Sequence, residues 1–171
     1  EISKNCDIFC NDAFSVSHRA HSSTEGVTHF LPSYAGLLLQ KEIKEIEKIL
    51  KNPAVPIVAL VGGAKVSTKM KLLSSLIKKV DYLIIGGGMA NTFLYALGKN
   101  IGKSLCEFEM KDDALKILKL SDVHNCKIYL PCDIVCSNKL SKESKQKTFD
   151  VEKCPDDLLI LDAGEKTVNE I

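Results

Sequence analysis

The order of apolar and polar positions changes character along the chain, and from about residue 57 onward it is regular. Short apolar runs at 57–61 and 80–85 are typical of buried parallel strands. Between these runs, apolar residues recur every three or four positions, as in a helix packed on a sheet. The residues of that stripe are Val66, Met70, Leu73, Ile77 and Val80. The pattern predicts an α/β fold with a Rossmann-like parallel sheet and flanking helices.

Other stretches predict further elements with less regular patterns. A helix is expected from about Ser33 to Lys51, with Asn52 and Pro53 ending it. Its apolar stripe consists of Leu39, Ile43, Ile46 and Leu50. Two further helices are expected, at 89–97 and at about 109–119, the second with Leu115 and Leu118 facing inward. Short strands are expected at 8–9, 127–130 and 158–161. Residues 137–147 are expected to form a polar loop or hairpin.

Both predicted central strands end in glycines. Gly62 and Gly63 follow the first strand, and residues 86–88 are three glycines after the second. Parallel strands present their carboxyl ends at one edge of a sheet, where open α/β folds bind ligands. A tight or flexible turn explains either glycine cluster by itself, whereas the pair favours a nucleotide or phosphate cleft. Gly98 is expected to end the helix that follows the second cluster.

Two lysines, Lys65 and Lys69, fall in the opening turns of the helix predicted after the first glycine pair. A positive charge near a helix N-terminus is unfavourable by a few tenths to about 1 kcal/mol unless an anion is present. The N–H groups of a first helical turn are free to bind that anion. We therefore expect the lysines, one turn apart on a shared face, and free N–H groups to hold phosphate. The segment fits neither G-x-x-x-x-G-K-[ST] nor G-x-G-x-x-G.

Composition restricts the class of protein. The 171 residues are 45% hydrophobic and 26% charged, with a net charge of +1, which is typical of a globular domain. No charge excess or long apolar run points to nucleic acid or membrane as a partner. Seven cysteines without a C-x-x-C pair predict reduced structural thiols, no metal site and a cytoplasmic location. A redox or zinc protein built on these cysteines is the weakest alternative.

Longer segments around the glycines closely resemble phosphoglycerate kinase, namely VGGAKVSTKMKLL, DYLIIGGGMANTFL and GKNIGKSL. Upstream, residues 11–23 are similar to that family's NDAF-xxx-HRAHSS segment. Downstream, residues 130–133 and 161–164 resemble its LP-x-D and LD-x-G turns. The resemblance thus extends through nearly the whole chain. It departs from the family at Ile160, often a glycine, and at Glu165, often a proline, so no role is assigned to that turn.

The resemblance implies a two-lobed kinase of which this chain is an internal part. Residues 1–31 would end the N-terminal substrate lobe, residues 32–52 would form the interdomain helix, and residues 53–171 would be part of the C-terminal nucleotide-binding lobe. The family's DFN, H-x-GRP and late Gly-Gly-Asp-Thr elements are missing from the sequence. Because the last of these helps to hold Mg²⁺, the metal ligand of Mg-ATP or Mg-ADP is expected elsewhere. By itself the chain is expected to be weakly active or inactive.

The reaction implied is reversible phosphoryl transfer from 1,3-bisphosphoglycerate to ADP, giving 3-phosphoglycerate and ATP in glycolysis. Lys65 would be catalytic and stabilise the migrating phosphoryl group, and Lys69 would hold the nucleotide phosphates. The small residues Gly62, Gly63, Ala64 and Gly87 would let the backbone approach the nucleotide closely. The enzyme is expected to be a cytoplasmic monomer with small-molecule substrates, binding neither nucleic acid nor membrane.

The resemblance also gives a role to the basic loop near the start of the chain. A guanidinium is a planar two-pronged donor suited to phosphate or carboxylate. The residues alone favour a solvated basic loop. The resemblance reverses this reading, because it implies that Arg19, with His18 beside it, contacts 3-phosphoglycerate. The competing class is a nucleotide- or anion-binding Rossmann-like module without transferase activity, which an assay of the intact gene product distinguishes.

Overall fold

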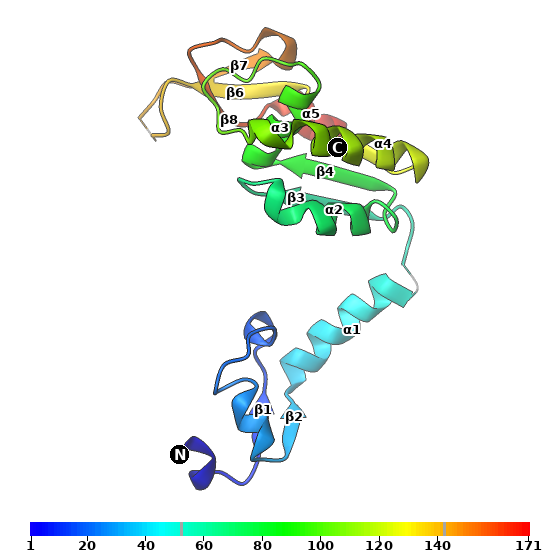
Figure 1. Ribbon diagram of the computed structural model, residues 1–171, viewed down its shortest axis with the longest axis vertical. Coiled ribbons are helices and arrows are strands. Elements are labelled where there is room, and N and C mark those ends of the chain that lie inside the picture. Colours follow the sequence, from blue (N-terminus) through cyan, green and yellow to red (C-terminus); the bar gives the residue numbers. More distant parts are fainter. Residues whose placement is uncertain (52, 142) are drawn as a thin grey trace. The chain divides into compact units, whose positions relative to one another are not determined.

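The structure is a computed structural model that describes residues 1–51, 53–141 and 143–171. The chain divides into a first unit, Glu1–Ala54, and a second unit, Val55–Ile171 (Figure 1). Each unit has its own sheet structure, so the two are described separately. None of the helices in the described ranges is both long enough and apolar enough to span a bilayer.

The first unit contains a small two-stranded sheet and one long helix. Strand β1 (Phe9–Asn11) pairs in parallel with β2 (Ser33–Ala35), and helix α1 covers Leu37–Lys51. Three short 3₁₀ helices complete the unit: η1 (Ile2–Asn5), η2 (Phe14–Val16) and η3 (Gly26–His29). Val27 and Leu39 are the buried hydrophobic side chains among its described residues. The first unit therefore has very little core of its own.

Helix α1 begins four residues later than the sequence predicted. Residues 33–35 pair with β1 as strand β2, and this pairing prevents the helix from starting at Ser33. The Leu39 N–H then donates to Asp12 Oδ1 at 2.9 Å, which satisfies one donor of the first helical turn. Asn52, expected to end the helix with Pro53, lies outside the described residues. In the apolar stripe predicted for this helix, only Leu39 is buried, and Leu50 is 63% exposed.

The second unit contains the parallel sheet that the sequence predicted. Its order is β3 (Val58–Gly62), β4 (Tyr82–Gly86), β5 (Lys127–Tyr129), and all pairings are parallel. Figure 1 shows α2 (Met70–Leu76), α3 (Gly87–Ala96) and α4 (Lys111–Val123) beside this sheet. The helix predicted directly after the first glycine pair begins only at Met70, because a 3₁₀ turn, η4 (Ser67–Lys69), precedes α2.

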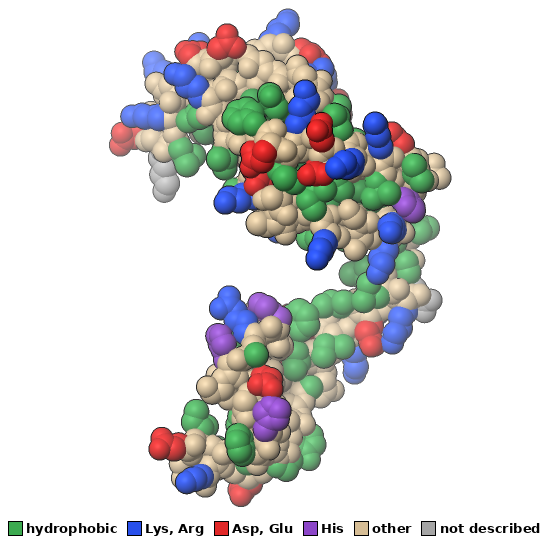
Figure 2. Space-filling model, in the orientation of Figure 1, with side chains coloured by type: hydrophobic (Ala, Val, Ile, Leu, Met, Phe, Trp, Pro, Cys, Tyr) green, Lys and Arg blue, Asp and Glu red, His purple; other side chains and the backbone are tan. Residues whose placement is uncertain are grey.

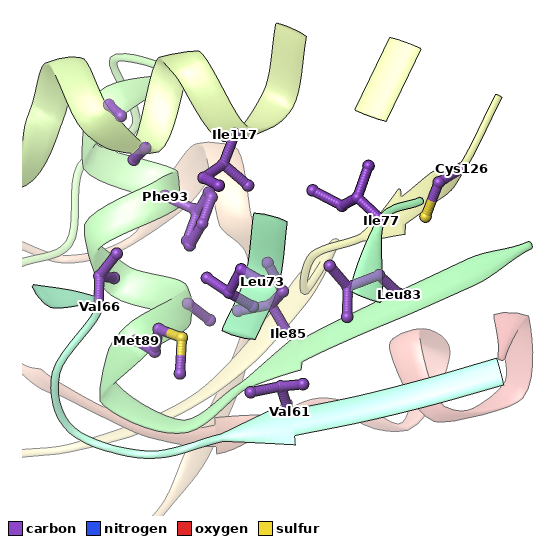
Figure 3. Close-up of a cluster of buried hydrophobic side chains, with 13 residues drawn as sticks. Val61, Val66, Leu73, Ile77, Leu83, Ile85, Met89, Phe93, Ile117 and Cys126 are labelled. Carbon is purple, nitrogen blue, oxygen red and sulfur yellow. The ribbon is translucent and has the colours of Figure 1, made fainter. Parts of the chain in front are cut away.

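The main core lies between these helices and the sheet, as Figure 3 shows. Val66, Leu73 and Ile77 of the predicted stripe are fully buried, and Met70 and Val80 pack against the same cluster. The other labelled members are Val61, Leu83, Ile85, Met89, Phe93, Ile117 and Cys126. The helix-like spacing read from the sequence is therefore confirmed as the packing surface of this segment.

The ends of α3 and α4 show how local sequence sets the boundaries. Gly98 has φ +79°, its N–H donates to Tyr95 O at 2.9 Å, and the Lys99 N–H donates to Leu94 O at 2.9 Å. This pair of bonds is the Schellman arrangement that glycine favours, and it confirms Gly98 as the end of the helix. Helix α4 follows the 3₁₀ helix η5 (Phe108–Met110) and is longer than predicted. Its predicted inward residues, Leu115 and Leu118, are partly buried against the core.

A second sheet of three antiparallel strands was not predicted. Its order is β7 (Lys147–Asp150), β6 (Asp133–Ser137), β8 (Leu159–Ala163), and only β8 matches a strand expected from the sequence. The polar segment 137–147 joins β6 to β7 as a hairpin, with Lys142 outside the described residues. The 3₁₀ helix η6 (Val151–Lys153) and helix α5 (Glu165–Glu170) complete the unit. The sheet packs on a smaller core: Leu94, Ile101, Ile134, Cys136, Val151 and Cys154.

Candidate functional site

The two glycine turns lie side by side at the carboxyl edge of the parallel sheet. Gly62 stands opposite Gly86 in the register of β3 and β4. The Met89 N–H, in the first turn of α3, donates to Gly63 O at 2.8 Å. These contacts confirm the prediction that the two turns form one feature of the fold.

Gly87 is a position where only glycine fits. Its φ is +66°, and a Cβ placed on it would lie 3.1 Å from Gly63 O and 3.2 Å from Gly63 N. A side chain would therefore be strained by the backbone conformation and would also push the first glycine turn away. The close contact between the two turns depends on this glycine.

The two lysines lie at the first turn, but not on a common helical face. Lys65 is exposed and lies before the start of η4, and Lys69 is the last residue of that 3₁₀ turn. The prediction of two lysines one α-helical turn apart is therefore wrong. Lys69 instead folds back over the glycine turn, where its Cε would lie 3.3 Å from a Cβ placed on Gly63. Lys69 is thus placed beside the glycine turn by its side chain, and Lys65 is near it because it follows Gly63 by two residues.

The Ser67 N–H, two residues after Lys65, is not free to bind phosphate, which corrects the sequence-based expectation for this group. The Ser67 N–H donates to Glu107 Oε2 at 3.0 Å, and the Ser67 hydroxyl donates to Glu107 Oε1 at 2.5 Å. Glu107 is 40 positions away along the chain, in the segment before α4. Sequence reasoning missed it because a single glutamate at that distance belongs to no motif.

The ionisation of Glu107 reflects these contacts. Burial by itself raises the pKa of the Glu107 carboxyl, but hydrogen bonds from the Ser67 hydroxyl, the Ser67 N–H and the Val66 N–H lower it, as does the charge of Lys65. The net effect is a pKa below the ordinary value of a glutamate. Glu107 is therefore an anion next to the lysine at neutral pH.

A pocket of about 360 Å³ opens beside the glycine turns, within the second unit. Its lining includes Gly62, residues 86–88 and Ile160 from β8. The polar side chains at its lining are Asn91, Tyr129, Asp162 and Thr167, and most of the remaining lining is apolar. Lys65 and Lys69 are not part of the lining. The local pattern of the sequence pointed to the glycines of this pocket, and only the family resemblance pointed to its lining residues 130–131 and 160–163.

Asp133 fixes the helix that closes one side of the pocket. Asp133 Oδ1 accepts from the Thr167 N–H at 2.8 Å and from the Thr167 hydroxyl at 2.5 Å, and Oδ2 accepts from the Lys166 N–H at 3.1 Å. Burial alone raises the pKa of Asp133, but these hydrogen bonds hold it below its ordinary value. The carboxylate thereby anchors the first turn of α5, from which Thr167 reaches the pocket.

The predicted substrate residues Arg19 and His18 lie in an exposed loop of the first unit. Thr24 holds this loop, because its hydroxyl donates to Arg19 O at 2.5 Å and accepts from the His21 N–H at 3.1 Å. Arg19 is the only arginine of the sequence. Figure 2 shows basic and histidine side chains gathered at one end of this unit. The loop is thus exposed to solvent, and the bonds of Thr24 hold its backbone through residues close in sequence.

The cysteines are all free thiols in this structure. Cys126, Cys136 and Cys154 are buried, and burial raises the pKa of Cys136 to about 11. Cys6 and Cys10 of the first unit are exposed. Among the described residues, no group of three or more histidine, cysteine, aspartate or glutamate side chains is placed to hold a metal ion.

These features define an α/β protein with a pocket and two joined glycine turns at the carboxyl edge of a parallel sheet. The family model for phosphoglycerate kinase matches residues 1–171. The chain belongs to the phosphoglycerate kinase family.

Individual relatives agree with this assignment. The chain is 51% identical over 170 residues to a phosphoglycerate kinase of Brucella suis, a match that covers 99% of this chain and 43% of that protein. It is 54% identical over 158 residues to one of Ruegeria pomeroyi, covering 92% and 40%. The solved structure of phosphoglycerate kinase from Coxiella burnetii superposes with a TM-score of 0.85 at 42% identity, covering 99% and 44%. The chain spans less than half the length of these relatives.

Proposed function

We propose that the protein to which this chain belongs is a phosphoglycerate kinase. It transfers a phosphoryl group reversibly between 1,3-bisphosphoglycerate and ADP, giving 3-phosphoglycerate and ATP. The observation that carries the proposal is the junction of the two glycine turns, where Met89 N–H binds Gly63 O and Lys65 stands exposed. Family membership supplies the reaction, and this junction supplies the positive charge and close backbone that phosphoryl transfer requires.

Each residue of the junction has a distinct role in this proposal. The Lys65 ammonium meets the equatorial oxygens of the group in flight, where charge is spread in the transition state. Lys69, folded over Gly63, holds the phosphates of the nucleotide. Close approach of the nucleotide is permitted by Gly62, Gly63, Ala64 and Gly87. The apolar pocket lined by Gly62 and Ile160 adjoins these groups and suits the uncharged part of the nucleotide.

The substrate and the lobes are assigned in the same way. Arg19, with His18, binds the 3-phosphoglycerate moiety by a two-pronged contact. Residues 1–31 end the N-terminal lobe, residues 32–52 form the interdomain helix, and residues 53–171 belong to the nucleotide-binding lobe. The division of the chain between Ala54 and Val55 supports a boundary close to residue 53.

Mg²⁺ enters this scheme with the nucleotide. In the part of the chain that the structure describes, no group of three or more histidine, cysteine, aspartate or glutamate side chains is placed to hold a metal ion. The ion would neutralise phosphate charge when bound, with protein ligands from outside this chain. We propose in addition that the enzyme is a cytoplasmic monomer that acts on small molecules.

The test is Lys65→Ala in the complete gene product. Turnover should fall by about 100- to 1,000-fold, the range seen when one preorganised transition-state donor is removed. The dissociation constant for ADP, measured by calorimetry, should change far less, because Lys69 and the glycines remain. The matched control is Lys71→Ala, which removes an exposed lysine of α2 and should leave turnover unchanged.

Two results would overturn the proposal. Turnover close to wild type in Lys65→Ala would remove the role assigned to this lysine. A wild-type gene product that binds ADP but transfers no phosphoryl group would instead identify a nucleotide-binding module without transferase activity.

A further inference from the structure

The carboxylate of Glu107 occupies the position at the start of η4 where an anionic ligand was expected from the sequence. It binds both the N–H and the hydroxyl of Ser67, at 3.0 and 2.5 Å. Ser67 is two residues after Lys65, and the Thr68 hydroxyl donates back to Lys65 O at 3.2 Å. The backbone on the C-terminal side of the lysine is therefore fixed by hydrogen bonds from both directions.

Glu107 is itself held by buried groups of α3. Its N–H donates to the Thr92 hydroxyl at 3.1 Å, and Thr92 is fully buried. The residue before Thr92, Asn91, donates through Nδ2 to Leu105 O at 3.1 Å, and Asn91 is 3% exposed. Buried polar groups in such networks are costly to leave unpaired, so they hold their partners in one arrangement. The segment that carries Glu107 is thereby attached rigidly to the helix that begins at the second glycine turn.

Glu107 thus connects the two glycine turns by a second route. The direct route is the contact of Gly87 and Met89 with Gly63. The second runs from α3 through Thr92 to Glu107 and then to Ser67. The two routes bracket Lys65, one on each side of it along the chain. A side chain on an exposed turn would otherwise sample many positions, and transfer to a bound nucleotide requires one.

We propose that Glu107 is a positioning residue: it fixes the backbone that follows Lys65 and so sets where the lysine ammonium meets the phosphoryl group in flight. This inference rests on the proposed phosphoglycerate kinase activity. Glu107 contacts neither substrate in this role and acts only through Lys65. Its negative charge also excludes phosphate from the N–H groups of η4, which leaves the ammonium groups as the anion-binding elements of this turn.

The experiment compares Glu107→Ala, Glu107→Gln and the control Glu109→Gln in the complete gene product. Glu109 is exposed, two positions away, and should tolerate the change. Glu107→Ala should lower kcat about 10- to 100-fold, as misplacing a catalytic group by about 1 Å does. KM for ADP should stay within about threefold, because the glycines and Lys69 are untouched. Glu107→Gln keeps one carbonyl acceptor for Ser67 and should recover part of kcat.

The decisive measurement is the double mutant. If Glu107 acts only through Lys65, adding Glu107→Ala to Lys65→Ala should lower kcat by less than about threefold further. If the double mutant loses kcat by the product of the two single-mutant losses, the inference is overturned. A wild-type kcat in Glu107→Ala would also overturn it. A general loss of structure would show as weakened binding of both substrates and a lower melting temperature, and it would also overturn the inference. If the wild-type gene product is inactive, the proposed function fails first, and the inference fails with it.

Discussion

The two units of this chain differ in what supports their candidate residues. In the second unit, the glycine turns and Lys65 sit above a core that includes Leu73, Met89 and Phe93, all fully buried. In the first unit, the Arg19 loop is held by Thr24 and the buried hydrophobic residues described are Val27 and Leu39. A catalytic group that must be held to within a fraction of an ångström needs the first kind of support. A residue that binds a flexible anion by its charge and two N–H donors can function in a loop that is held only by a few local hydrogen bonds.

Hydrogen exchange of this 171-residue chain gives the largest expected contrast. The amides of Phe9 and Gly36 are hydrogen-bonded, to Pro32 O and Asn11 O, yet they belong to a unit with little buried surface. The amides of Leu83 and Ile85 belong to the central strand of the main core. We expect the core amides to exchange at least about a thousandfold more slowly, because local opening is opposed by buried apolar contacts. Equal protection of the two sets would remove the distinction between the units.

Truncation of leucines in the two units tests the same contrast by stability. Leu73→Ala should lower the free energy of unfolding by about 2–5 kcal/mol, since Leu73 is fully buried. Leu38→Ala, on α1, removes a side chain that is 54% exposed and should change it by less than about 0.5 kcal/mol. Leu72→Ala, 45% exposed on the same helix as Leu73, controls for helix propensity. Urea titration measures all three, and similar losses for Leu38 and Leu73 would contradict the comparison.

The carboxylates that bind helix starts provide a smaller effect that depends on pH. Asp133→Asn should lower the free energy of unfolding at pH 7 by about 1–3 kcal/mol, because an ionised acceptor of three hydrogen bonds is lost. The pKa of Asp133 is lower in the folded state than the ordinary 3.8. Its stabilisation is therefore complete above that value and is lost as pH falls through the folded pKa.

The measurement for Asp133 is the difference between wild type and mutant at each pH, since acid affects other carboxylates in both proteins. This difference should be largest at pH 7 and shrink toward pH 2. Asp12→Asn in the first unit is the matched variant, because Asp12 accepts one N–H, from Leu39, and asparagine caps a helix nearly as well. A difference for Asp133 that grows on acidification would show that the sign assigned to its pKa is wrong.

These elements also show what the sequence predicts and what it does not. Apolar spacing predicted β3, β4 and the buried stripe around Leu73, because those segments bury one regular face. It did not predict β7, whose four residues are mostly polar and exposed and are stabilised by pairing with β6. It placed the start of α1 at Ser33, where pairing with β1 overrides helix propensity.

The candidate site was predicted in the same uneven way. Glycines and lysines that follow a strand are visible as a local pattern, and Gly62, Gly63 and Gly87 do meet in space. Glu107 is brought to this region only by the fold, from a position 40 residues beyond Ser67. The part of the pocket lining that comes from β8 was marked in the sequence only by the resemblance of residues 161–164 to the family's LD-x-G turn. The sequence also could not reveal that the Ser67 N–H is already occupied, because that bond depends on the path of the chain between α3 and α4.

The smallest predicted effect concerns the exposed loop of the first unit, and it tests whether that loop is a site at all. Arg19→Lys keeps the charge but loses the planar two-pronged contact with an anionic substrate. In the complete gene product, KM for 3-phosphoglycerate should rise about tenfold, equivalent to about 1.4 kcal/mol. KM for ADP should stay unchanged, because the groups assigned to ADP lie at the glycine turns of the second unit. Both substrates are titrated at one ionic strength, since charge contacts weaken with salt. Equal weakening of both would mean that Arg19 supports the fold and not the substrate, and the assignment of the loop would then be wrong.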